Sequence, residues 1–573
     1  MAKKNTYQQK ARPWRRPKYI GCKAGESVGG EVSKTVGGAL SNQPVTASIL
    51  IMPARRATTV LASIITAIAV TIILYASAMA AMVMPIPTAA TGAIIEKSTT
   101  AIAVKYLVEK PTDMPKPNQQ KINEKKLTSQ KSNGNQPQPD PNQPIKITID
   151  RGTIKTINLG LSPIVTNKAP ADSDLAQKIF ATINNNLRNA GLFDISTIAT
   201  PNQGTIPQRL ADLKKNGYQF ILTAEIIHDT NKTASALNNN LILTAHLWDL
   251  SRGGGKETIG KDILGEHGIT LKTTRDNWHR LASQLSDDIY TRLSGEKGYF
   301  DSRIAFIAED GSKKKRIKRL AIMNQDGSGL QYLSSGRNLV LTPRFSNSQH
   351  MLSYISYATG APQVVIFDLM TGITKNIGRY DGMSFAPRFS PDDKQLIFSI
   401  ENNGATNIYI KPLNGSNTAL PLTNDSNINT SPSFAPDGQH IAFTSDRDGS
   451  PQVYIMNKDG SGIKRISYGA GSYSTPVWSP RGDYIAFTKQ YNNIFYIGIV
   501  KPDGSDERLL SDSFLDEGPT WSPNGRGIAF FRQPTADDDT LSLWTVDITG
   551  RFIRKIPVGV SGSDPSWSPL NSR

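Results

Sequence analysis

A pattern of proline-flanked aromatic residues and short apolar strands repeats through the C-terminal half of the chain. The element Pro-x-aromatic-Ser/Ala-Pro begins at Pro387, Pro432, Pro476, Pro519 and Pro565, and a copy that lacks only the last proline begins at Pro343. The first prolines of successive copies lie 44, 45, 44, 43 and 46 residues apart. This period is typical of a four-stranded propeller blade.

The residues between the motifs predict the remaining strands of each blade. A short apolar strand such as Ile441-Ala442-Phe443 follows the motif, and an alternating strand such as Gln452–Met456 comes next. A turn such as Asp459-Gly460 then leads into a fourth strand at Lys464-Arg465. Glycine supplies the positive φ that a tight hairpin turn needs.

The count of motifs and strands predicts how the ring closes. The strand Ile304-Ala305-Phe306 has no motif before it, and the last motif, Pro565–Pro569, has no such strand after it. Six motifs match six strands only if the C-terminus completes the blade that Ile304 begins. Closure of this kind removes exposed strand edges. We expect the motif's aromatic residue to pack between neighbouring blades.

Residues 145–297 lack this period and predict a small α/β domain. One helix is indicated by apolar residues every four positions after Asp172 and before Gly191, and a second ends near Gly295; their apolar positions are Leu175, Ile179, Ile183 and Leu187, and Trp278, Leu281, Leu285 and Ile289. Between them, residues 220–226 and 241–247 are typical of paired strands.

The region before residue 145 predicts export. Residues 57–95 carry no charged side chain, and the stretch from Val60 to Val83 is long enough to span a bilayer as a helix. Arg55 and Arg56 precede it, which orients the N-terminus to the cytoplasm. Small-x-small sites such as Ala76-Ser77-Ala78 allow cleavage, so the segment is either a signal peptide or an uncleaved anchor.

The predicted architecture is an all-β six-bladed propeller plus a small α/β domain. Its parts are a basic cytoplasmic leader (1–56), the apolar signal or anchor segment (57–95), a Pro-rich disordered linker (96–144), the α/β domain (145–297) and the propeller (298–573).

Charge is concentrated outside the predicted folded region. The net charge is +17 for the whole chain, but residues 1–56 hold +9 and residues 96–144 hold +3 of it. The remaining +5 over residues 145–573 argues against a nucleic-acid partner.

No catalytic pattern emerges from the residues. The six histidines form no HxH or HxxxH pair, and neither a Gly-x-Ser-x-Gly elbow nor a phosphate-binding glycine loop is present. Asp446-Arg447-Asp448-Gly449 begins like a calcium loop but has Asn457 where that loop needs glutamate, so it predicts a hairpin turn. We expect a protein-binding platform without a cofactor or a metal. The alternatives are a propeller-type hydrolase or lactonase, and a membrane-anchored propeller with another partner.

From about residue 145 to 570 the chain resembles the TolB family, the periplasmic propellers of the Tol-Pal cell-envelope system. The resemblance rests on Thr444-Ser445-Asp446 with Pro451–Tyr454, on Phe514-Leu515-Asp516-Glu517 before Pro519, and on the closing Pro565–Leu570. It implies a non-enzymatic scaffold in the periplasm that supports outer-membrane integrity and constriction in cell division.

The resemblance also implies two partners. The family binds the peptidoglycan-associated lipoprotein, Pal, on one propeller face near the channel mouth, and TolA through the segment after the signal peptide. Aligned by motif, the Pal contacts fall at Met383, Ala386 and Thr430; the last two match the family residue, whereas Met383 stands where relatives carry histidine. We expect the loop at Phe514, Leu515, Asp516 and Glu517 to lie on the same rim. Membrane contact is expected only through residues 57–95, if they stay uncleaved.

Overall fold

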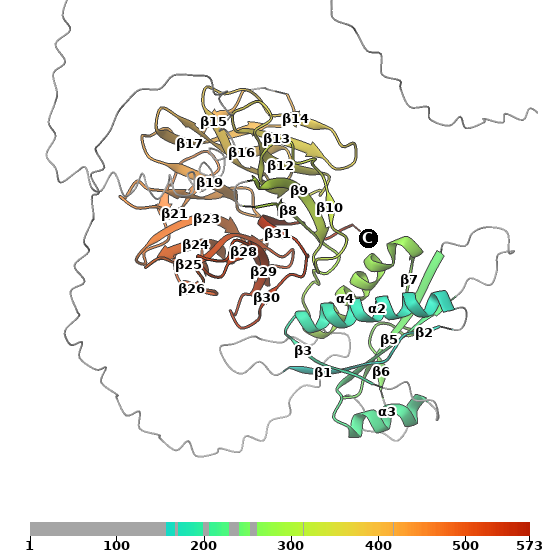
Figure 1. The fold of residues 1–573 in the computed structure, drawn as a ribbon. Coiled ribbons are helices and arrows are strands. Elements are labelled where there is room, and N and C mark those ends of the chain that lie inside the picture. The colour runs from blue at the N-terminus through green and yellow to red at the C-terminus, as the bar shows by residue number, and fades with distance from the viewer. Residues whose placement is uncertain are drawn as a thin grey trace, which may run out of the picture. The chain divides into compact units, whose positions relative to one another are not determined.

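The structure is a computed structural model that describes residues 156–166, 170–198, 206–227, 240–251, 260–312, 315–415 and 418–572. The predicted leader, apolar segment and linker lie outside the described residues. Within the described ranges, no helix is both long and apolar enough to cross a membrane. The described elements form an α/β domain and then a propeller (Figure 1).

A seven-stranded mixed sheet is the centre of the α/β domain. Its strands are β1 (Ile157–Leu161), β2 (Val165–Thr166), β3 (Phe193–Thr197), β4 (Phe220–Ile227), β5 (Asn240–Asp249), β6 (Lys261–Asp262) and β7 (Ile269–Thr274). The main path runs β3-β1-β4-β5-β6, with β2 beside β4 and β7 beside β5. β1 is parallel to β3 and β4, whereas the predicted pair β4 and β5 is antiparallel, as expected for a hairpin.

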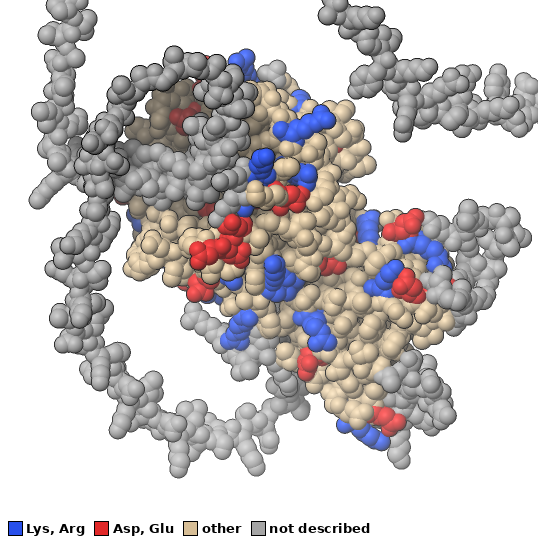
Figure 2. Space-filling view, in the orientation of Figure 1, with Lys and Arg blue, Asp and Glu red and all other residues tan. Residues whose placement is uncertain are grey.

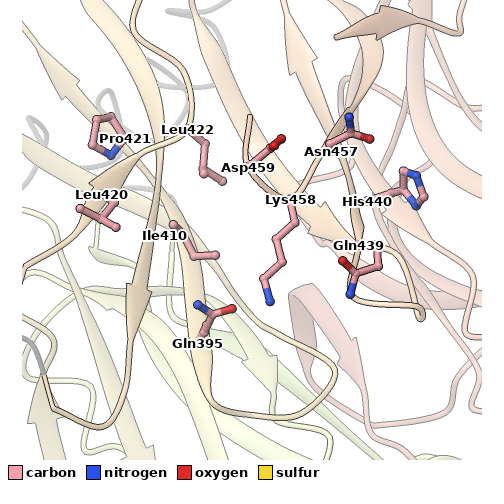
Figure 3. Close-up of a pocket in the computed structure, with 10 residues that line it drawn as sticks. All are labelled: Gln395, Ile410, Leu420, Pro421, Leu422, Gln439, His440, Asn457, Lys458 and Asp459. Atoms are coloured by element: carbon pink, nitrogen blue, oxygen red, sulfur yellow. The ribbon is translucent and has the colours of Figure 1, made fainter. Parts of the chain in front are cut away.

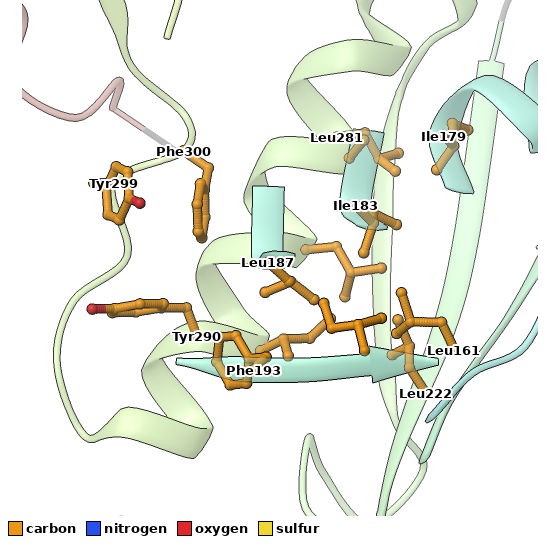
Figure 4. Packing of buried hydrophobic residues seen from close by; sticks show 14 of the residues in the cluster. Leu161, Ile179, Ile183, Leu187, Phe193, Leu222, Leu281, Tyr290, Tyr299 and Phe300 are labelled. Carbon is orange, nitrogen blue, oxygen red and sulfur yellow. The ribbon is translucent and has the colours of Figure 1, made fainter. Parts of the chain in front are cut away.

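Helices cover both faces of this sheet. The helices α2 (Pro170–Asn189) and α4 (Trp278–Ser294) pack on one face, and a 3-10 turn at Arg275–Asn277 leads into α4. The shorter α3 (Ile206–Lys215) packs on the other face. Strand alternation divides the core, because Leu222 faces α2 and α4 (Figure 4), whereas the neighbouring residue, Ile221, packs with Leu210 of α3.

The two predicted helices are confirmed together with their C-terminal ends, but α2 begins at Pro170, so the predicted N-terminal cap at Asp172 lies inside its first turn. Their apolar stripes are buried against each other and against the sheet, at Ile179, Ile183 and Leu281 among others (Figure 4). Gly191 and Gly295 follow the helices with φ of 71° and 75°, the left-handed turn that glycine adopts without strain. The sequence patterns did not predict α3, β1 or β3.

Six four-stranded antiparallel sheets form the propeller, as predicted. Blade 1 has β8 (Arg303–Asp310), β9 (Ile317–Asn324), β10 (Gln331–Tyr332) and β31 (Ser561–Trp567); blade 2 has β11 (Val340–Phe345), β12 (Met351–Ser356), β13 (Gln363–Asp368) and β14 (Thr374–Asn376); blade 3 has β15 (Met383–Phe389), β16 (Gln395–Asn402), β17 (Ala405–Pro412) and β18 (Leu420–Pro421). Blade 4 has β19 (Asn429–Phe434), β20 (His440–Ser445), β21 (Gln452–Asn457) and β22 (Lys464–Arg465); blade 5 has β23 (Ser472–Trp478), β24 (Ile485–Tyr491), β25 (Ile494–Val500) and β26 (Arg508–Leu509); blade 6 has β27 (Leu515–Trp521), β28 (Gly527–Gln533), β29 (Ser542–Asp547) and β30 (Ile553–Lys555).

The innermost strands form a closed ring around the channel. They are β31, β11, β15, β19, β23 and β27, and each packs against the next around the circle. The C-terminal β31 pairs with β8, from Ser561 opposite Glu309 to Trp567 opposite Ile304, which confirms the predicted closure. A blade shared between the two ends of the chain leaves no open seam.

Every innermost strand carries a bulge directly before the motif proline. The six bulge residues have positive φ; they are Thr342 (47°), Ala386 (50°), Ser431 (54°), Thr475 (48°), Gly518 (66°) and Asp564 (52°). The strand pairing shifts register at each of them. A bulge bends the strand and re-aims its side chains. Five of the six residues are not glycine, so the ring stores backbone strain that the surrounding sheets must hold.

The motif residues connect each blade to the next. The aromatic residue packs against the preceding blade, as Phe389 does on Val364 and Trp521 on Val477, which confirms the predicted packing. The residue after the motif's first proline supplies a second link in three blades. Ser566, Ser433 and Thr520 accept hydrogen bonds through their hydroxyls from the backbone N–H of Phe345, Trp478 and Trp567, each at 3.1 Å.

The link at Thr520 joins blade 6 to the closing strand and gives a stability prediction. Thr520→Val keeps the side-chain shape but leaves the buried N–H of Trp567 without its acceptor. We expect the free energy of unfolding, measured with urea, to fall by about 1–3 kcal/mol. Thr359→Val, at an exposed hairpin turn, is the control and should change it by less than about 0.5 kcal/mol. Equal losses in both variants would show that the link contributes nothing.

Candidate functional site

The two ends of the channel differ in the connections they carry. Each innermost strand starts at the end where the hairpin between the second and third strands lies; Met383 of β15, for example, pairs with Glu401 beside the Asn403-Gly404 hairpin. We call this end the hairpin rim. The opposite end, the turn rim, carries the turn after each motif and the turn between the third and fourth strands, such as Asp326-Gly327.

The described contacts of the α/β domain with the propeller fall on the turn rim. His279 Nε2 lies 2.7 Å from Asp326 Oδ2, and Gln325 Nε2 donates to Asn186 Oδ1 at 2.9 Å. Glu296 forms an ion pair with Arg526. These propeller residues belong to blades 1 and 6. The hairpin rim is therefore the end of the channel that this interface does not use.

A buried carboxylate on α4 binds the connection between the domains. Asp287 of α4 accepts hydrogen bonds from the backbone N–H of Phe300 at 2.7 Å and of Asp301 at 3.0 Å. Burial outweighs these two hydrogen bonds and raises the pKa of Asp287 to about 7. Tyr290, Tyr299 and Phe300 pack beside it in edge-on and tilted contacts (Figure 4).

Three predicted site residues lie on two neighbouring innermost strands. Met383 begins β15, Ala386 is the bulge residue of the same strand, and Thr430 is the second residue of β19. All three side chains are half-buried. Ser399 of β16 donates to the Thr430 hydroxyl at 3.5 Å, which ties the two blades together at this point. The structure thus brings these residues to one arc of the hairpin rim.

A polar network behind Thr430 holds that arc in place. Arg447 donates to Asn429 Oδ1 at 2.9 Å and lies 3.4 Å from Asp425 Oδ2. Its guanidinium also lies over the rings of Phe443 and Tyr454, at 5.5 and 5.2 Å from their centroids. Arg447 belongs to the segment predicted as a hairpin turn, and Gly449 confirms that turn with φ of 96°. The sequence pattern predicted this turn but not the contacts that Arg447 makes behind Thr430.

The predicted loop at residues 514–517 lies across the channel. Leu515, Asp516 and Glu517 are the first residues of β27, and Phe514 precedes them. β27 and β15 are separated by two innermost strands in either direction around the ring. The loop therefore shares the hairpin rim with Met383, Ala386 and Thr430 but does not touch their arc.

The four loop residues have different surroundings. Phe514 is 43% exposed, beside a bridge between Ser513 and Phe495, whereas Leu515 is half-buried. Asp516 is fully buried; it accepts from Arg532 Nε and Nη2 at 2.7 and 2.6 Å and from the Ser511 hydroxyl at 2.7 Å. Asp516 thus positions the rim, while Phe514 is available for direct contact. Tyr491 and Ile494, exposed on the adjacent hairpin, were missed because the repeat marks them only as hairpin ends.

Four charged side chains line consecutive innermost strands. They are Glu517 on β27, Asp564 on β31, Arg344 on β11 and Arg388 on β15. Burial, and then repulsion from Asp564, raises the pKa of Glu517 to about 7. Burial also raises the pKa of Asp564 and lowers those of both arginines. Each group is half-buried by its solvent exposure, as expected on the wall of a water-filled channel.

A separate cavity of about 610 Å³ lies between blades 3 and 4 at the turn rim (Figure 3). Lys458 extends between Gln395 and Gln439 in this view, while Leu420 and Pro421 lie on the opposite wall. None of the predicted site residues lines it. In the part of the chain that the structure describes, no group of three or more His, Cys, Asp or Glu residues could hold a metal ion. Acidic and basic side chains are interspersed on the face in Figure 2.

The raised pKa of Glu517 predicts a pH-dependent stability. Folding favours the neutral carboxyl group, so the free energy of unfolding falls as pH rises from about 4.5 to about 7 and then levels off. Glu517→Gln removes this loss. Urea unfolding at pH 4 and pH 8 should show the variant gaining about 1–3 kcal/mol over the wild type between the two pH values, toward the lower figure because channel water screens the charge.

The control for this measurement is the exposed Glu266→Gln, which should change stability by less than about 0.5 kcal/mol at both pH values. Parallel pH profiles for the wild type and Glu517→Gln would contradict the assignment of the charge to a poorly solvated site.

Comparison with known proteins agrees with this architecture. Residues 290–571 match the family described as the TolB beta propeller domain. The chain is 38% identical over 431 residues to the Tol-Pal system protein TolB of Gluconobacter oxydans, covering 74% of this chain and 89% of the relative. The crystal structure of TolB from Acinetobacter baumannii superposes with a TM-score of 0.61 at 24% identity, covering 72% of this chain and 97% of that one, and shows the same fold. The chain belongs to the TolB family of Tol-Pal system proteins.

Proposed function

We propose that this protein is a periplasmic, non-enzymatic scaffold that binds Pal at the hairpin rim. The observation that supports it most is the placement of Ala386 and Thr430 on neighbouring innermost strands, at the end of the channel that the α/β domain interface leaves unused. Both residues match the family's Pal contacts by position in the repeat. Met383 completes the arc with a thioether in place of an imidazole, so that contact is apolar here.

The rim offers the chemistry that a folded protein partner needs. Binding energy at such interfaces comes mainly from a few anchoring side chains within a larger complementary surface. Phe514, Tyr491 and Ile494 are exposed apolar side chains on one side of the channel mouth. The arc of Met383, Ala386 and Thr430 lies on the other side. A partner seated over the mouth would contact both groups, which explains how two separate sets of residues serve one site.

The proposal extends to the rest of the Tol-Pal assignment. TolA would bind the segment that follows residues 57–95, and the scaffold would thereby link inner-membrane Tol proteins to Pal during outer-membrane constriction. The apolar segment directs export and touches the membrane only if it stays uncleaved. Both segments lie outside the described residues, so this part of the proposal rests on the sequence and on the family.

The site assignment predicts the effect of a bulky residue at the rim. Thr430→Trp places an indole where Pal is expected to approach, and capture of the full chain by immobilised Pal should weaken at least about tenfold. The melting temperature should change little, because Thr430 is half-buried and the hydrogen bond that its hydroxyl accepts from Ser399 is long. Met370→Trp, at an exposed position on the turn rim, is the matched control and should bind as the wild type does.

Two results would contradict this proposal in different ways. Equal capture of Thr430→Trp and wild type would show that the Pal site lies elsewhere on the chain. Failure of the wild-type chain itself to bind Pal would contradict the function.

A further inference from the structure

Two arginines occupy a repeat position that elsewhere links the blades. Arg344 and Arg388 each follow the first proline of their motif. In the other four repeats this position holds Ser433, Val477, Thr520 and Ser566. Three of those residues are the hydroxyls that accept a hydrogen bond from the next blade. Blades 2 and 3 therefore carry a cation where the repeat favours a stabilising hydroxyl.

Neither arginine side chain forms an ion pair with an acidic residue in the described part of the chain. Arg344 donates to the carbonyl oxygen of its own neighbour, Pro343, at 2.7 Å. The side chain of Arg388 makes no hydrogen bond or ion pair with another residue in the described part of the chain. The two arginines lie on adjacent innermost strands, and repulsion from Arg344 adds to the cost of the charge on Arg388. Asp564 attracts Arg344 from the neighbouring strand but forms no ion pair with it.

An unpaired charge on a partly buried wall costs stability unless it has a task. A guanidinium is a planar fork of N–H donors that matches the two oxygens of a carboxylate. Two such forks side by side, with no internal acceptor for the second, leave donors that only a ligand or water can satisfy. The neighbouring polar residues of the ring, Thr430 and Ser431 on β19, add no opposing charge.

We propose that Arg344 and Arg388 form a carboxylate-binding site on the channel wall, which takes an acidic side chain of an extended polypeptide segment entering from the hairpin rim. Arg388 lies five residues along β15 from Met383, so an extended segment of about five residues, at about 3.3 Å per residue, reaches it from the mouth. The inference rests on the proposed function in placing a protein partner at that mouth. It adds the chemistry of the group that the partner inserts.

Two acidic side chains on the strands that precede Arg344 in the ring limit which ligands the site accepts. Glu517 and Asp564 lie on β27 and β31, and both hold their protons more tightly than usual because of burial. Asp564 lies on the strand next to Arg344, so a ligand with several negative charges meets repulsion there. A segment that is acidic at one position and uncharged around it therefore fits better than a uniformly charged small anion.

The test uses the variant that the repeat itself suggests. Arg388→Ser installs the residue found at Ser433 and Ser566, so the full chain should fold and melt at the same or a higher temperature. The probe is a hexapeptide of one glutamate and five glycines with blocked ends, titrated against the full chain by calorimetry. We expect its dissociation constant to rise about tenfold in Arg388→Ser, and further in the double variant with Arg344→Ser. Lys394→Ser removes one charge from the turn rim of the same blade and should bind the peptide as the wild type does.

The outcomes separate this inference from the proposed function. Unchanged affinity in Arg388→Ser, or a fall in its melting temperature that shows a structural role, would overturn the carboxylate site while leaving Pal capture intact. Equal loss of affinity for acetate and for the glutamate peptide would overturn the polypeptide part and leave a small-anion site. Equally tight binding of the same peptide with glutamine in place of its glutamate would overturn the role of charge. Because the peptide assay contains no Pal, it reads the site even if the chain does not capture Pal.

Discussion

The pairing of β31 with β8 is the contact on which the rest of the structure depends. Four-stranded blades have two open edges each, and a ring of them is stable only when every innermost strand packs against two neighbours. The C-terminal strand supplies the missing innermost strand of blade 1 and so converts a row of blades into a closed channel. Closure also gives blade 1 an innermost strand that starts at the hairpin rim, as those of the other five blades do.

The innermost strands adopt a strained backbone conformation at defined positions, and this strain costs stability. Five non-glycine residues hold positive φ directly before a proline, and the motif aromatics and the hydroxyl links between blades are in place to hold that strain. Where the repeat departs from its own pattern, at Arg344 and Arg388, a stabilising link is replaced by a charge. Local rules are broken most often where a protein has a task to perform, and here the departures line one channel.

The repeat and its closure were predictable because proline and aromatic residues recur at a fixed period, and the α/β helices were predictable because their apolar residues recur every turn. The bulges were not, since Thr342, Ser431 and Asp564 avoid positive φ in short peptides and adopt it only within the assembled sheets.

The candidate site was predicted in part. Met383, Ala386 and Thr430 form one arc, but the loop at Phe514 lies across the channel, and Asp516 is buried against Arg532, a partner brought close only by the β27-β28 hairpin. Whether these residues contact Pal stays a prediction.

We expect the hairpin rim, and not the turn rim, to be the face that receives the partner. Hydrogen–deuterium exchange on the full chain, with and without Pal, measures this at every backbone amide in one experiment. We expect slower exchange on Pal binding at the starts of β15, β19 and β27, with the turns around Asp326, Lys394 and Asp459 unchanged. Protection confined to those turns, or to the cavity between blades 3 and 4, would contradict it.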